Sequence, residues 1–251
     1  MTESSPIFAV VLAAGKGTRM KSNRAKVLHT LCGMPMVNYV IEATRPLLPE
    51  GLFVVVGHQA ELVEDVLPPD ATPVIQKEQR GTGDAVRVAL EALEGREDGI
   101  LLVVNGDGPL VSDATLGELL ARHRSAGVGA TVLVAKLEDP SGLGRVVEEA
   151  GVVRIVEERD ASEAERENRM VNLGLYAFEL AEIRDAIGGL DAGNDQGELY
   201  LTDVLETIGR RSRAVRVLGS ESRVVRVHFS NSLQTRSGTP NAAAEGSVPP
   251  P

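Results

Sequence analysis

The sequence has 251 residues, a formal net charge of −10 and 43% hydrophobic residues, which is typical of a globular protein with a full apolar core. The acidic balance and an aromatic content of 3% without tryptophan exclude a broad nucleic-acid surface or a stacking platform for single strands. The single cysteine, Cys32, excludes a disulfide framework and is expected to be a small buried hydrophobe, and the histidines lack metal-ligand spacing. Without an evident targeting or membrane-spanning segment, we expect a cytoplasmic protein that contacts neither membrane nor nucleic acid.

The first half of the chain alternates between β-branched apolar runs and amphipathic segments. Strands that alternate with helices predict a Rossmann-like α/β fold, with a mostly parallel mixed sheet and helices on both faces. Ligands of such sheets bind at the carboxyl ends of the strands. The hydrophobic patterns predict strands at 7–12, 52–56, 74–76, 100–104 and 130–137, and helices at 34–44 (with Pro35 in the first turn), 59–66, 82–93 (with Thr82 as N-cap) and 115–124.

The second half begins with an expected β-hairpin and ends in a polar tail. Residues 230–251 are rich in Ser, Thr, Gly and Pro and are expected to be disordered. The remaining patterns predict hairpin strands at 145–149 and 152–157, an exposed loop or short helix at 158–169, a strand at 171–178, helices at 180–187 and 198–208, and late strands at 214–218 and 224–229.

The loop 12–20 follows the first buried strand and is the first candidate site. Gly15 and Gly17 allow a sharp turn with accessible backbone N–H groups, and Arg19 and Lys26 can bind phosphate oxygens. The loop is not a Walker A motif, and a methionine stands where the dinucleotide fingerprint has its third glycine. A phosphate site is therefore favoured over a purely structural turn, and an NAD-dependent dehydrogenase is disfavoured.

Asp107 directly follows another buried strand and lies between Gly106 and Gly108. By position alone it fits an Asx-turn residue that closes a loop. A lone carboxylate at such a site also suits Mg²⁺, which keeps several waters and takes phosphates as further ligands. Because the phosphate loop is expected at the same sheet edge, we favour the metal interpretation.

Several motifs in the same order carry a resemblance to a known family. The motifs are LAAGKGTRMKSNRAKVLH from Leu12, QKEQRGTGDA from Gln76, VVNGDGPL from Val103, GLGRVV from Gly142, IVEERDA from Ile155, VNLGLYAF from Val171 and GELYLTD from Gly197. With these motifs the chain resembles, from residue 8 to 223, the nucleotidyltransferases that make sugar nucleotides, and it is most similar to the uridyltransferase domain of bacterial N-acetylglucosamine-1-phosphate uridyltransferases.

The resemblance implies a nucleotide-diphospho-sugar transferase (GT-A-like) fold and synthesis of UDP-N-acetylglucosamine, a cell-wall precursor, from UTP and N-acetylglucosamine-1-phosphate with Mg²⁺. It implies one domain at 1–229, with a nucleotide-binding half at about 6–137 and a sugar-binding half at about 138–229. The implied roles are nucleotide binding for Leu12, Ala13, Ala14, Gly15 and Asn105, uracil recognition for Gln76, Gly81 and Thr82, triphosphate binding and catalysis for Arg19 and Lys26, magnesium binding for Asp107 and Glu221, and sugar binding for Gly144, Glu157, Asn172 and Thr202.

The chain departs from the family pattern at several of these positions. Ala25 stands where the family usually has a proline, and Asn105 and Leu143 stand where it has tyrosines. Leu173 replaces a threonine, and Glu221 aligns with an asparagine metal ligand. These changes leave the identity of the sugar more open than the type of reaction.

Alternative interpretations keep the fold and change the function. The chain could use another nucleotide or sugar phosphate, or it could bind UDP-sugars without catalysis. Full-length relatives continue into a β-helix acetyltransferase domain, and its hexapeptide repeats are missing from this sequence. We therefore expect no acetyltransferase activity and leave the oligomeric state open.

Overall fold

The computed structural model describes residues 5–17, 20, 22–149, 152–194, 196–211 and 215–219. Arg19 and Glu221, two predicted site residues, lie outside these ranges. The predicted strand at 224–229 and the predicted disordered tail at 230–251 also lie outside them.

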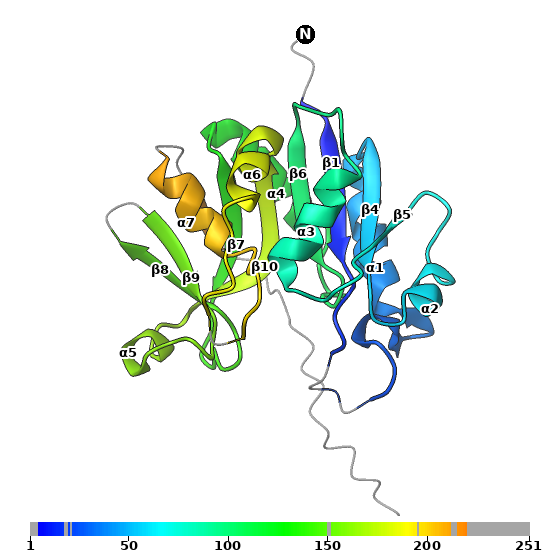
Figure 1. The fold of residues 1–251 in the computed structure, drawn as a ribbon, viewed down its shortest axis with the longest axis horizontal. Helices are drawn as coiled ribbons and strands as arrows, with labels where there is room; N and C mark the ends of the chain where they lie inside the picture. Colours follow the sequence, from blue (N-terminus) through cyan, green and yellow to red (C-terminus); the bar gives the residue numbers. More distant parts are fainter. Residues whose placement is uncertain are drawn as a thin grey trace, which may run out of the picture.

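A mixed, mostly parallel sheet forms the centre of the molecule (Figure 1), which confirms the predicted fold class. β1 pairs in parallel with β4 and β6, β4 with β5, and β11 with β7, whereas β10 is antiparallel to both of its neighbours, β6 and β7. The strand order is β11 (Val215–Gly219), β7 (Ala130–Lys136), β10 (Met170–Glu179), β6 (Ile100–Asn105), β1 (Ile7–Leu12), β4 (Gly51–Val56) and β5 (Thr72–Ile75).

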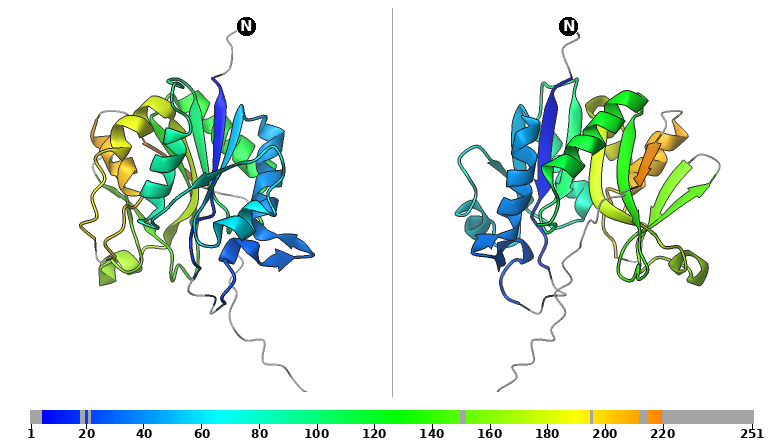
Figure 2. Two further views of the ribbon diagram at one scale, coloured as in Figure 1. Left: turned by 45° about the vertical axis from the view of Figure 1, so that its right-hand side comes forward. Right: turned by 180° about the vertical axis from the view of Figure 1, so that it is seen from behind.

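Helices cover both faces of this sheet (Figure 2). Alternate side chains of β1 enter opposite cores: Phe8 and Val10 pack into one, and Ala9 and Val11 into the other. The first core includes α3 (Thr82–Glu91), α6 (Leu180–Ile187) and α7 (Asp203–Arg210), and the second includes α1 (Met36–Thr44), α2 (Ala60–Glu64) and α4 (Asp113–Ala126).

The remaining short elements lie outside this seven-strand path. The predicted hairpin is present as β8 (Arg145–Glu149) and β9 (Val152–Val156), and it joins the sheet where Arg145 pairs with Val171 of β10. The charged segment after it contains α5 (Glu163–Arg166). Lys26–Leu28 and Arg45–Leu47 form 3₁₀ turns, and β2 (Thr30–Leu31) pairs with β3 (Met34–Pro35).

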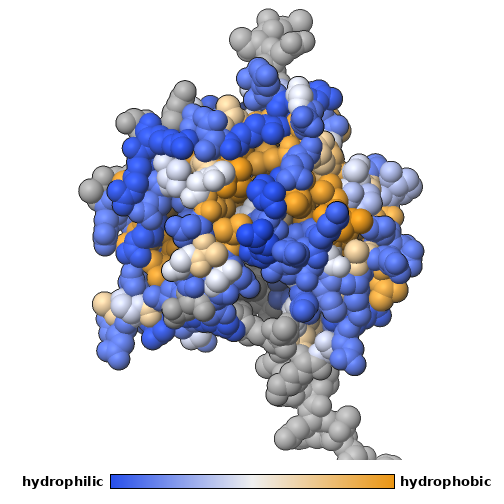
Figure 3. All heavy atoms as spheres, viewed as in Figure 1, coloured by the Kyte–Doolittle hydropathy of each residue, from blue (hydrophilic) through white to orange (hydrophobic). Residues whose placement is uncertain are grey.

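The surface is mainly hydrophilic on the face of Figure 1, where apolar residues gather in the middle, around α3 and α6 (Figure 3). No helix in the described ranges is both long enough and apolar enough to cross a membrane.

Two residue-level expectations were wrong because turn geometry decides them. Cys32 is exposed, since it occupies the β2–β3 turn with φ of 48°. Thr82 is not the N-cap of α3. Gly81 takes that place with φ of 112°, which favours glycine, and the Thr82 hydroxyl instead accepts a hydrogen bond from the N–H of Leu201 at 3.0 Å.

The helices predicted at 34–44 and 198–208 begin later than expected. Pro35 is the N-cap of α1, so it precedes the first turn. Residues 198–200 are not helical, because the backbone of Leu199 bonds to another loop: its N–H donates to Arg80 O at 2.7 Å and its carbonyl accepts from Gly83 N at 2.8 Å. A tertiary contact therefore overrides the local helical pattern.

Candidate active site

The candidate site lies at the carboxyl ends of β1 and β6. The register of these parallel strands places Leu12 opposite Asn105. The loops that follow them therefore begin side by side, as the sequence predicts for a ligand site at this edge.

Lys26 and Asp107 form an ion pair between these loops. The Lys26 ammonium donates to Asp107 Oδ2 at 2.6 Å, although 81 positions separate the two residues in sequence. Their side chains are 26% and 30% exposed, so both can reach a ligand. The pair places one cation and one carboxylate at the same point of the cleft.

The backbone around Lys26 is held by close packing and by one amide side chain. Gly17 has φ of 62°, and a Cβ built there would come within 2.5 Å of Lys26 Cβ, so only glycine fits. The N–H of Ala25 donates to Gln59 Oε1 at 2.7 Å, and Gln59 Nε2 donates to Asn23 O at 2.8 Å. Gln59 therefore fastens the segment before Lys26 to the loop after β4.

A cavity of about 560 Å³ lies over the first loop. All the described residues predicted to bind the nucleotide, and Asp107, line it: Leu12, Ala13, Ala14, Gly15, Lys26, Gln76, Gly81, Thr82, Asn105 and Asp107. An adjoining cavity of about 290 Å³ is lined by the four predicted sugar residues, Gly144, Glu157, Asn172 and Thr202.

Asp107 lines both cavities and also a third one, of about 400 Å³, that Lys26 shares. The structure therefore brings the described candidate residues together around Asp107. Glu198 lines all three of these cavities and Tyr200 lines two, yet sequence reasoning missed both. The GELYLTD motif contains both residues, but its prediction as a helix gave no reason to place their side chains in the site.

The polar groups in the wall of the smaller cavity differ in how many hydrogen bonds they already make. Asn172 is already bonded at both ends of its amide: Nδ2 donates to the Tyr176 hydroxyl at 2.6 Å and Oδ1 accepts from Gly174 N at 3.0 Å. Thr202 is 4% exposed, and its hydroxyl has no hydrogen-bond partner in the described part of the chain. Because buried hydroxyls are nearly always paired, the Thr202 hydroxyl is a candidate partner for a ligand.

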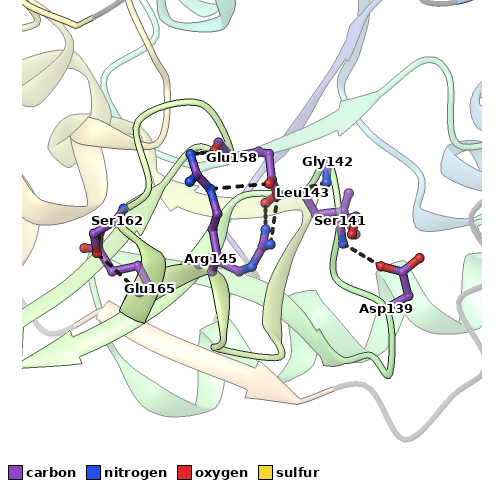
Figure 4. A network of polar contacts seen from close by, with 9 residues as sticks. Asp139, Ser141, Gly142, Leu143, Arg145, Glu158, Ser162 and Glu165 are labelled. Carbon is purple, nitrogen blue, oxygen red and sulfur yellow. Dashed lines mark hydrogen bonds and ion pairs between the residues drawn. The ribbon is translucent and has the colours of Figure 1, made fainter.

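An ion pair between a buried arginine and a partly exposed glutamate contacts the loop between the smaller cavity and β8 (Figure 4). Arg145 is 2% exposed, and its guanidinium lies 2.8 Å from Glu158 Oε2, which also accepts from Gly142 N at 2.9 Å. Burial would raise the pKa of Glu158, but the hydrogen bonds from Arg145 and Gly142 outweigh it and lower that pKa. Arg145 also donates to the carbonyl of Leu143, so the pair holds two adjacent residues at the end of the loop that leads into β8.

The donor set around Asp107 fits a cation that takes most of its ligands from elsewhere. Among the described residues, no group of three or more His, Cys, Asp or Glu side chains could hold a metal ion. A zinc site of protein ligands alone is therefore not formed by these ranges. One carboxylate in the wall of the 560 Å³ cavity suits Mg²⁺, which also coordinates phosphates and water.

A known protein family and several known proteins match most of the chain. Residues 9–171 match the family described as the MobA-like NTP transferase domain. The chain is 79% identical over 212 residues to the bifunctional protein GlmU of Rubrobacter xylanophilus, covering 84% of this chain and 45% of that protein. It is 48% identical to the bifunctional protein GlmU of Streptomyces avermitilis, covering 82% of this chain and 44% of that protein. The chain therefore spans about half the length of these relatives.

A solved structure supports the fold assignment. A UDP-glucose pyrophosphorylase complexed with UDP-glucose superimposes with a TM-score of 0.69 at 20% identity, covering 86% of this chain and 91% of that one. At this identity the likeness establishes the fold alone.

Proposed function

Since the chain belongs to the MobA-like NTP transferase domain family, we propose that it transfers a uridylyl group from UTP to N-acetylglucosamine-1-phosphate with Mg²⁺, in the cytoplasm. The products are UDP-N-acetylglucosamine and pyrophosphate. The observation that carries the proposal is the ion pair of Lys26 and Asp107, which lies where the cavity over the loop after β1 adjoins a smaller cavity. The resemblance to N-acetylglucosamine-1-phosphate uridyltransferases supports the choice of base and sugar.

In the proposed reaction, a phosphate oxygen of the sugar-1-phosphate attacks the α-phosphorus of UTP. The bond between the α-phosphorus and the bridging oxygen breaks, and pyrophosphate leaves with that electron pair. The chain contributes position and charge rather than a covalent intermediate. The 560 Å³ cavity holds the nucleotide, and the 290 Å³ cavity holds the sugar.

Lys26 and Asp107 exchange partners when substrate binds. In the free protein their charges neutralise each other across 2.6 Å. An incoming triphosphate competes for the Lys26 ammonium, because the triphosphate group carries more negative charge than one carboxylate group. This exchange leaves Asp107 available to hold Mg²⁺, which when bound neutralises and orients the phosphates.

The sugar side of the proposal depends on groups that face the smaller cavity. Glu157 and Asn172 supply a carboxylate and an amide for sugar hydroxyls and an acetamido group. Thr202 adds the unpaired buried hydroxyl. Leu143 and Leu173 make part of the same wall apolar, which suits the methyl group of an acetamido substituent.

A pyrophosphate-release assay with UTP, Mg²⁺ and a panel of sugar-1-phosphates tests this proposal. We expect release to be fastest with N-acetylglucosamine-1-phosphate and to require the metal. Replacing UTP with dTTP or CTP in the same assay measures the preference for the base. No pyrophosphate with any sugar phosphate in the panel would overturn the proposal.

A further inference from the structure

A buried carboxylate, Asp84, is bonded to Gln76 in the wall of the 560 Å³ cavity. Asp84, in the first turn of α3, is 3% exposed. Its Oδ2 accepts a hydrogen bond from Gln76 Nε2 at 2.8 Å. Its Oδ1 accepts from Arg87 Nη2 at 2.6 Å and from Arg87 Nε at 3.2 Å. Gln76 is itself 3% exposed and lines the cavity.

Asp84 is a carboxylate rather than a neutral acid. Burial alone would raise the pKa of Asp84, but the hydrogen bonds from Arg87 and Gln76 outweigh it and lower the pKa. Its place in the first turn of α3 also favours a negative charge. An ionised carboxylate accepts hydrogen bonds and donates none.

The charge of Asp84 determines which way round the Gln76 amide lies. Only the amino group of Gln76 can face Asp84, because its oxygen would meet a second acceptor there. The same amino group donates to the carbonyl of Gly81 at 3.1 Å, so both of its hydrogens are used. Among the described residues nothing donates to Gln76 Oε1, and this oxygen is not among their fully buried, unpartnered atoms. The amide therefore offers an acceptor as its free group.

We propose that Asp84 is a specificity-determining positioning residue, which fixes the Gln76 amide so that the cavity accepts a pyrimidine with a hydrogen on N3 and disfavours one without it. Uracil carries that hydrogen and donates it, whereas cytosine has an acceptor at N3. The inference rests on the proposed function, because it places the base of the nucleotide beside Gln76. It adds a selecting residue that does not itself contact the nucleotide.

The test measures binding of UTP and CTP, each with Mg²⁺ and without sugar phosphate, by calorimetry. The variant Asp84→Asn keeps the size of the side chain. Arg87 still donates to this side chain, so the oxygen of the new amide faces Arg87 and its amino group faces Gln76. The Gln76 amide is then no longer held in one orientation by a carboxylate. We expect the preference of the wild-type chain for UTP over CTP to fall by about tenfold.

The matched control is Glu91→Gln, which removes a carboxylate bound to the same Arg87 at 3.0 Å without touching Gln76. Its preference should equal that of the wild type.

A second measurement needs no variant and keeps the test informative if Asp84→Asn does not fold. The wild-type chain should bind the triphosphate of 3-methyluridine, which lacks the N3 hydrogen, about tenfold or more weakly than UTP. An unchanged UTP preference in folded Asp84→Asn, or equal binding of the methylated nucleotide, would overturn the inference and leave the proposed function standing. A third outcome is that the wild-type chain binds UTP but never releases pyrophosphate, while the variant shows a reduced preference for UTP over CTP. That outcome would uphold the inference and overturn the proposed catalysis. A wild-type chain that binds neither nucleotide would overturn both.

Discussion

At the residue scale, the proposed reaction depends most on the ion pair of Lys26 and Asp107. Exposed ion pairs contribute about 1 kcal/mol or less to stability, and both side chains here are about one quarter to one third exposed. The fold therefore gains little from the pair. Its place where the cavities meet supports the proposed role in binding phosphates and metal.

Lys26→Ala and Asp107→Ala should each reduce the rate of pyrophosphate release by about 100- to 1,000-fold, because each removes a preorganised charge from the transferring phosphates. Thermal unfolding should change little. Lys136→Ala, which removes an exposed lysine from the end of β7, serves as the control and should keep the wild-type rate. Near-normal turnover in either site variant would remove that residue from the mechanism.

Gln59 and Ala25 give a second residue-scale prediction. Ala25 has φ of −53°, which proline can adopt, but its N–H is bonded to Gln59, and proline has no N–H. Gln59→Ala should lower kcat by about tenfold, because the segment before Lys26 loses its anchor. Adding Ala25→Pro should restore part of the rate by stiffening the same segment. If the double variant is as slow as Gln59→Ala alone, rigidity of this loop is not what Gln59 supplies.

The sequence predicted the candidate residues better than the contacts that hold them. Loop glycines, a lysine and an aspartate after buried strands are visible in a linear motif. The bond between Ala25 and Gln59 spans 34 positions, and the bond between Thr82 and Leu201 spans 119, so neither follows from local pattern. Cys32 was misjudged for a related reason, since hydropathy does not report the φ of a turn.

At the element scale, the hairpin β8–β9 carries a buried charge, Arg145 of β8, whose partner is Glu158 just after β9. Removing the carboxylate in Glu158→Ala should destabilise the fold by about 3 kcal/mol, because it leaves the guanidinium of Arg145 buried without its partner. The double variant with Arg145→Met should recover part of that loss in a urea titration. We also expect a higher KM for the sugar phosphate with little change for UTP, since Gly142 loses its acceptor. Equal effects on both KM values would contradict a local role.

The capping box of α5 gives the element-scale pH prediction. Hydrogen bonds from Ser162 and Arg154 lower the pKa of Glu165 from 4.5 to about 2. The stabilising contribution is therefore present above pH 4.5 and is lost as pH falls through about 2. Glu165→Gln should lower the free energy of unfolding by about 1 kcal/mol at neutral pH, and the difference should vanish near the lower value.

Glu163→Gln, at an exposed position on the same helix, is the matched control and should show no such pH dependence. A Glu165→Gln defect that persists unchanged at the acidic end would show that charge is not the cause.

Element boundaries were predictable where one face of an element is buried along its whole length. The helix Leu180–Ile187 has the predicted bounds, and the hairpin strands differ from the prediction by one residue at the end of β9. The helix predicted at 198–208 begins at Asp203 because Leu199 bonds to Arg80 and Gly83 of a distant loop. A pattern of apolar residues carries no information about such a partner.

At the scale of the whole molecule, the segments expected to bind nucleotide and sugar share one sheet. β10, from the later part of the chain, lies between β6 and β7 of the earlier part. Asn105 of β6 packs so closely on Gly174 of β10 that a Cβ at Gly174 would come within 2.0 Å of the amide nitrogen. The bond between Thr82 and Leu201 also joins the earlier and the later part of the chain. These contacts join residues that line the two cavities.

The reverse reaction is the measurement that tests the central claim most directly. With UDP-N-acetylglucosamine, pyrophosphate and Mg²⁺, the wild-type chain should form UTP and N-acetylglucosamine-1-phosphate. Chelation of the metal should abolish this formation, and Asp107→Ala should slow it by about 100- to 1,000-fold. Binding of UDP-N-acetylglucosamine without any formation of UTP would contradict the account and identify the chain as a sugar-nucleotide binding protein.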